Sequence, residues 1–67
     1  MAIEQDEATF IEMAHKVGIT DPRASEIYNV ADVIDVWTRD MLAEELNFAG
    51  YYDEKADHLV EAGVTFV

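Results

Sequence analysis

Residues 30–48 read VADVIDVWTRDMLAEELNF and form the longest stretch of helical pattern in this 67-residue chain. Apolar residues recur there at the three- and four-residue spacing that places side chains on one face of a helix: Val30, Val33, Ile34, Trp37 and Met41. Leu42 and Leu46 lie on a different side of the predicted helix from this stripe, so the apolar surface of the helix is wide. We therefore expect one helix over about 30–48 that is contacted by two neighbours, or by one neighbour and a second subunit.

A second helical pattern lies at the start of the chain. Its apolar residues fall on one stripe: Ile3, Phe10, Met13, Ala14 and Val17. Acidic residues occupy the first turns, where the positive end of the helix dipole favours carboxylates. Gly18 is placed to end the helix in the left-handed conformation. We therefore expect a helix over about 3–17.

The sequence between these two segments allows two interpretations. Asp21 followed by Pro22 is typical of an N-cap residue and the first residue of a helix. Asn29 offers a second N-cap. We favour a short helix over about 22–28 with a break or kink near Asn29, and a continuous helix from Pro22 is the alternative.

The C-terminal part of the sequence predicts one more helix. Asp53 can cap a helix over about 54–62, and Gly63 follows where it would end. Residues 64–67 form an apolar tail that either packs against the body or binds a partner. With no cysteine to reinforce so short a chain, we expect a single all-α domain over 1–67, a compact bundle of three to four helices.

The charge of the chain excludes several functions. Fifteen Asp and Glu against four Lys and Arg give a formal net charge of −11. Because Lys and Arg contact phosphates, we expect neither direct binding of nucleic acid nor docking on anionic lipid. The acidic N-terminus and the lack of a long apolar run predict no signal peptide, no membrane span and a cytoplasmic location. An apolar fraction of 51% argues against intrinsic disorder.

The sequence predicts neither catalysis nor a cofactor. It has no cysteine, no nucleophile-elbow pattern and no glycine-rich phosphate loop. Glu12 and His15 have the i, i+3 spacing found in di-iron bundles. Glu54 and Glu61 flank His58 on another helical face. Solvated polar faces explain both groups more simply, so we predict a non-enzymatic protein without metal ligands.

The acidic residues themselves are the strongest functional pattern. They recur three or four residues apart on predicted helices, where such side chains are neighbours. Arg39 is expected to pair with Asp35, four residues before it. Tyr51 and Tyr52 share a predicted turn, so we expect one in the core and one exposed. The residues predicted to bind a partner are Asp32, Asp35, Asp40, Glu44, Glu45, Tyr51, Tyr52, Asp53, Glu54 and Asp57.

These patterns predict a small acidic protein that binds a basic surface of another protein. The favoured version is an inhibitor of the phage or mobile-element type, a nucleic-acid mimic that occupies the nucleic-acid-binding surface of its partner. This prediction is an analogy of fold and charge. The alternative is a structural or regulatory homo-oligomer, by default a dimer, whose acidity serves solubility or adaptation to high salt. Its predicted interface consists of Trp37, Met41, Leu42 and Leu46.

Overall fold

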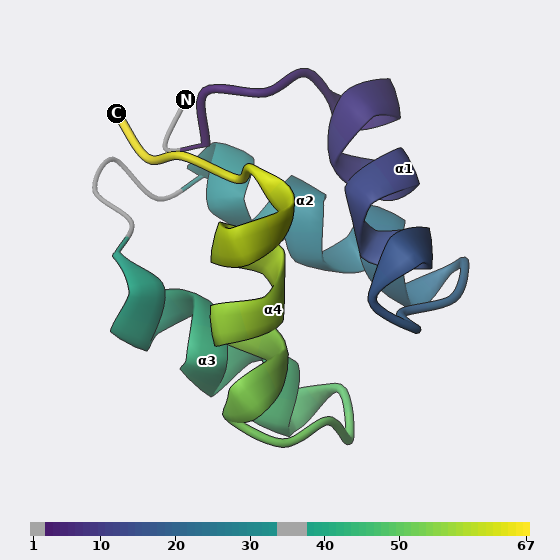
Figure 1. The fold of residues 1–67 in the computed structure, drawn as a ribbon, viewed down its shortest axis with the longest axis vertical. Coiled ribbons are helices and arrows are strands. Elements are labelled where there is room, and N and C mark those ends of the chain that lie inside the picture. Colours follow the sequence, from purple (N-terminus) through teal and green to yellow (C-terminus); the bar gives the residue numbers. More distant parts are fainter. Residues whose placement is uncertain (1–2, 34–37) are drawn as a thin grey trace.

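The computed structural model describes residues 3–33 and 38–67 of the chain, with the side chains of 3–30 and 38–67. Four helices follow one another along this part of the chain: α1 (Glu7–Lys16), α2 (Arg23–Val33), α3 (Arg39–Phe48) and α4 (Glu54–Ala62). Helix α1 packs against α2, α3 packs against α4, and α4 also contacts α1 (Figure 1). The predicted all-α bundle is confirmed. None of the helices in the described ranges is long and apolar enough to cross a membrane.

Helix α1 begins at Glu7, later than the apolar stripe predicts. Asp6 is its N-cap, with an extended backbone and a carboxylate that accepts a hydrogen bond of 2.8 Å from the Thr9 backbone N–H. Ile3, which the stripe places in the helix, instead forms an isolated antiparallel bridge with Phe66. Ile3 is nevertheless buried in the core. Its apolar character therefore reflects burial from an extended segment, which helical spacing alone does not distinguish from burial on a helix.

The predicted break near Asn29 and the predicted single helix over 30–48 are both wrong. Helix α2 continues through Asn29 to Val33. Helix α3 starts only at Arg39, after Thr38, whose backbone is extended and whose hydroxyl oxygen accepts a hydrogen bond of 3.3 Å from the Met41 N–H. Thr38 is therefore the N-cap residue of α3, because it accepts a hydrogen bond from a backbone N–H group that has no partner within the helix. Residues 34–37 lie outside the described residues.

Helix α4 has the predicted bounds, and Gly63 ends it with a left-handed backbone at φ +118°. Asp53 precedes the helix, but its carboxylate makes no capping hydrogen bond, contrary to the prediction. Its Oδ1 instead accepts a hydrogen bond of 2.6 Å from the Asn47 side-chain amide. The Asp53 carboxylate thus accepts a hydrogen bond from a side chain of α3 and does not cap α4.

Both terminal segments contribute to the core. Phe10 of α1 is fully buried, and its ring centroid lies 5.4 Å from that of Tyr28 in α2. The Tyr28 hydroxyl donates a hydrogen bond of 2.7 Å to the backbone carbonyl of Gln5, so the polar end of this buried ring has a partner. Val64 of the C-terminal tail is only 2% exposed. The tail therefore packs against the body, which was one of the two predicted alternatives.

Gln5 ties the tail to the segment before α1. Its side-chain amide donates to Thr65 Oγ1 at 3.0 Å, and its Oε1 accepts from the Thr65 backbone N–H at 3.0 Å. The Glu4 N–H donates to the Thr65 carbonyl at 3.0 Å beside these contacts. The two ends of the described chain are thus held side by side (Figure 1). Of the apolar residues of the tail, Val67 is largely exposed, at 77%.

The helix boundaries predict opposite effects of two alanine substitutions. Thr38→Ala removes the cap of α3 and is expected to lower the free energy of unfolding by about 1 kcal/mol. Asn29→Ala places a better helix former at an exposed position inside α2 and is expected to raise it by about 0.5 kcal/mol. Urea denaturation followed by circular dichroism measures both. A helix that is capped by Asn29 and runs through residue 38 would give the opposite result: Thr38→Ala would raise the free energy of unfolding and Asn29→Ala would lower it. That result would contradict the helix boundaries of the structure.

Candidate functional site

The residues predicted to bind a partner gather mainly on α3 and α4. Asp35 lies outside the described residues, and of Asp32 only the backbone, in α2, is described. The remaining eight lie on these two helices and on the turn between them: Asp40, Glu44, Glu45, Tyr51, Tyr52, Asp53, Glu54 and Asp57. Because α3 and α4 pack against each other, the structure brings these residues onto one unit, the acidic helix pair, which comprises residues 39–62.

Arg39 links the two helices of this pair. Its Nε donates to Asp57 Oδ1 at 2.8 Å and its Nη2 donates to Asp57 Oδ2 at 3.0 Å. Its Nη1 also donates to Asp40 Oδ1 at 3.3 Å. The hydrogen bonds between Arg39 and Asp57 raise the pKa of the guanidinium and lower the pKa of the carboxyl. The pairing predicted for Arg39, with Asp35, lies outside the described residues.

Five carboxylates of the acidic helix pair divide into two groups. Asp40 and Asp57 bind Arg39, and Asp53 accepts the hydrogen bond from Asn47. Glu44 and Glu54 are exposed and make no side-chain hydrogen bond or ion pair with any described residue. The carboxylates of the first group are bound by side chains of the same chain, and those of the second present their charge to solvent. Sequence spacing alone does not distinguish the carboxylates of the first group from those of the second.

The positive charges of the chain are mostly bound within it. Arg23 Nη1 lies 3.1 Å from Glu26 Oε2, and Lys55 Nζ donates to the backbone carbonyl of Val17. Lys16 is exposed and forms no ion pair in the described ranges. Every carboxylate whose side chain is described is exposed, except that of Glu45, which is half-buried. The surplus of negative charge therefore faces outward over the whole described surface.

The two adjacent tyrosines separate as predicted. Tyr51 is half-buried against the core, and its hydroxyl accepts a hydrogen bond of 3.4 Å from the Thr20 N–H. Tyr52 is 79% exposed. Tyr51 is therefore part of the scaffold, and only Tyr52 is available to a partner.

Most of the residues predicted to form a homodimer interface are packed into the core of a single chain. Leu42 and Leu46 are fully buried in the core, and Met41 is half-buried against it. Trp37 lies outside the described residues. Neither leucine side chain is therefore open to a second subunit in this structure, and the core of a single chain explains why both positions are apolar. The homodimer itself stays a prediction.

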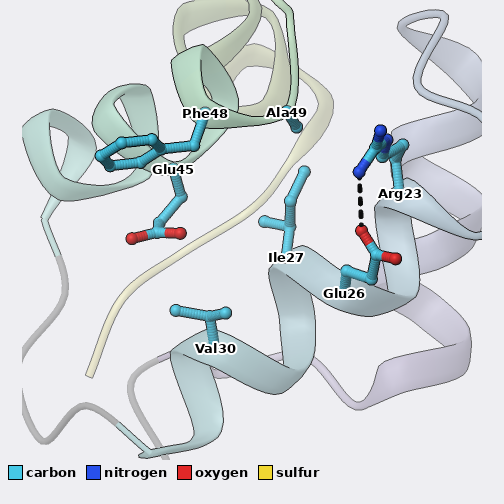
Figure 2. Close-up of a pocket in the computed structure, with 7 residues that line it drawn as sticks. All are labelled: Arg23, Glu26, Ile27, Val30, Glu45, Phe48 and Ala49. Carbon is cyan, nitrogen blue, oxygen red and sulfur yellow. Dashed lines mark hydrogen bonds and ion pairs between the residues drawn. The ribbon is translucent and has the colours of Figure 1, made fainter.

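A cleft lies between α2 and α3 beside these acidic residues, and the sequence patterns do not predict it. Its volume is about 150 Å³ and it opens to solvent. Figure 2 shows its seven lining residues: Arg23, Glu26, Ile27, Val30, Glu45, Phe48 and Ala49. Phe48 is 79% exposed. In one long helix Phe48 would continue the main apolar stripe and be buried, so the sequence carried no direct signal for the cleft.

The groups considered for metal binding do not assemble. His15 Nε2 lies 3.3 Å from Asp21 Oδ2, and Glu12 is exposed. Within the described ranges, no three or more His, Asp or Glu side chains are placed to hold a metal ion.

Comparisons with protein-family models, with curated proteins and with solved structures find no match to this chain.

The pairing of Arg39 with Asp57 predicts a pH-dependent stability. Asp57→Asn breaks the bidentate pair, so it is expected to lower the free energy of unfolding at neutral pH. Because the pKa of Asp57 in the folded protein lies below its usual 3.8, the stabilising effect is complete above that value and is lost as the pH falls through the folded pKa. The difference from wild type should therefore shrink as the pH falls below about 4 in urea unfolding curves.

Glu44→Gln is the matched control for this measurement, since it removes an exposed carboxylate that has no ion pair among the described residues. A difference between Asp57→Asn and wild type that stays constant down to the lowest pH would contradict the stabilising role of the pair.

Proposed function

We propose that this protein is a non-enzymatic binding module whose acidic helix pair docks on a basic, nucleic-acid-binding surface of a partner protein. One observation carries the proposal: Glu44 and Glu54 are exposed and form no ion pair with any described residue, while Arg39, the cation of the acidic helix pair that joins α3 to α4, is bound to Asp57. The pair therefore offers negative charge that the fold itself does not use.

The physical basis is electrostatic complementarity. Carboxylates spaced along helices present repeated negative charge, as phosphates do along a nucleic acid, so a groove lined with Lys and Arg attracts either one. Complementary charges speed association and fix orientation. Screening shortens the range of this attraction from about 10 Å at 0.1 M salt to about 3 Å at 1 M. We propose that the protein competes with nucleic acid for its partner and thereby inhibits it.

A homo-oligomer remains the alternative proposal. Of its predicted interface, Leu42 and Leu46 are buried in the monomer, and two copies that each carry a charge of −11 repel each other. Sedimentation at about micromolar concentration separates the two proposals, with a monomer expected. A dimer that persists at about 0.1 M salt, where charge repulsion is still felt, would favour the alternative.

The proposed function predicts competition that depends on salt. A partner is captured from the cells that make the protein, purified, and titrated with its nucleic acid in the presence of this protein. Nucleic-acid binding is expected to fall as the protein is added, and the effect is expected to disappear at about 1 M salt. Fluorescence anisotropy of labelled nucleic acid measures both. Competition that is unchanged at 1 M salt would contradict the proposal.

Two matched double variants locate the contact. Glu44→Lys with Glu54→Lys changes the acidic helix pair, and Glu4→Lys with Glu12→Lys changes exposed carboxylates outside it. Each double change moves the net charge from −11 by the same amount. The first is expected to weaken partner binding by about tenfold or more, and the second much less. Equal losses in both variants would show that net charge alone matters and that the helix pair is not the site.

A further inference from the structure

We propose that the α2–α3 cleft is a binding site for an arginine side chain of a basic partner segment. The proposal rests on the proposed function, because it requires a partner that presents basic residues. It adds the place on this chain where one of those residues is held.

The cleft combines an apolar lining with one uncompensated negative charge. Ile27, Val30 and Ala49 supply aliphatic surface. Arg23 and Glu26, at the other end of the lining, pair with each other at 3.1 Å, so their charges cancel. The Glu45 carboxylate forms no ion pair with any described residue (Figure 2). An apolar ligand would leave this carboxylate unpaired and an anionic ligand would be repelled by it, so the cleft suits a cation with an apolar stem.

Glu45 is well placed to hold such a cation. Figure 2 shows its carboxylate directed from α3 into the space between the two helices, on the side of Val30. Glu45 is half-buried, unlike every other described carboxylate. A charge that is partly removed from water attracts an opposite charge more strongly than an exposed one does, since the local dielectric constant is lower.

Phe48 favours arginine over lysine as the occupant. It lies three residues after Glu45, on the neighbouring position of the same helix face, and 79% of it is exposed. A planar guanidinium can stack on an aromatic ring while it donates to a carboxylate, whereas an ammonium group offers no flat face. The aliphatic stem of arginine covers apolar surface while its charged end stays accessible.

The size of the cleft fits one side chain. A cavity of about 150 Å³ in another protein accommodates a molecule the size of benzene, and the α2–α3 cleft has a volume of about 150 Å³. A whole helix does not fit into this space. A second copy of the chain is opposed by the charge of −11 on each molecule.

The test is a nuclear magnetic resonance titration with N-acetyl-arginine N-methylamide. Its matched control is the citrulline analogue, which has nearly the same shape and no charge, and the lysine analogue tests the preference for a planar cation. The arginine compound is expected to shift the backbone signals of Ile27, Val30, Glu45 and Ala49 in a saturable way, with a dissociation constant on the order of millimolar. The lysine compound is expected to bind more weakly and the citrulline compound not to bind.

Variants with matched controls test whether the Glu45 carboxylate and the Phe48 ring bind the arginine compound. Glu45→Gln is expected to abolish the arginine-dependent shifts, whereas Glu44→Gln, which removes the same charge one residue away, leaves them unchanged. Phe48→Ala is expected to weaken binding by about threefold, and Tyr52→Ala, an equally exposed aromatic residue, has no effect. All four side chains lie wholly or partly at the surface, so unchanged circular dichroism spectra are expected to show that the variants fold.

Three results of the titrations would overturn the cleft proposal: shifts confined to α4, equal shifts with the citrulline compound, or unchanged arginine binding by Glu45→Gln. None of them affects the proposed function, which is judged by competition with nucleic acid. Conversely, arginine binding in the cleft together with competition that is insensitive to salt would remove the proposed function and leave the cleft site. A dimer that becomes a monomer in Phe48→Ala would show that a second copy fills the cleft, and would also overturn the proposal.

Discussion

The burial of Leu42 and Leu46 sets the rotation of α3, and the candidate surfaces of this protein depend on that rotation. Both side chains are fully buried, one helical turn apart, and they hold one face of α3 in the core. Helical geometry then turns Phe48 to the opposite side, where most of its ring is exposed. The same rotation leaves Glu45 half-buried at the cleft and Glu44 in solvent. An α3 that buried Phe48 instead would have neither the cleft nor the same acidic surface.

Two of the four Lys and Arg residues of the chain connect helices. Arg39 joins α3 to α4 through Asp57. Lys55 of α4 donates to the carbonyl of Val17, just after the last turn of α1, where the negative end of the helix dipole favours a positive charge. A small domain with a large negative charge has little stability to spare, because the charges repel one another and the buried surface is limited. Using its cations between helices stabilises the fold and leaves the surface acidic.

In the two proposals, the acidic helix pair and the cleft bind the same class of partner and act over different distances. The field of the exposed carboxylates acts over roughly a Debye length, about 10 Å at 0.1 M salt, and steers a basic surface toward the protein. The proposed arginine site acts only on contact, through Glu45, Phe48 and the aliphatic lining of the cleft. Long-range charge sets the rate of encounter, and a partly buried contact sets how long the complex lasts. The two proposals thus describe separate steps of one binding event.

The sequence by itself determined the helical class, the acidic surface, the bounds of α4 and the different environments of Tyr51 and Tyr52. These features follow from local spacing, from glycine at a helix end, and from the exclusion of charge from a core. Only the tertiary structure decided that Ile3 is buried outside a helix, that Thr38 starts α3, and that Arg39 binds Asp57. The physical reason is the same in each case. A periodic pattern shows that a residue will be buried or exposed, but it carries no information on whether the residue belongs to a helix or to an extended segment, or on which distant side chain lies within hydrogen-bonding distance.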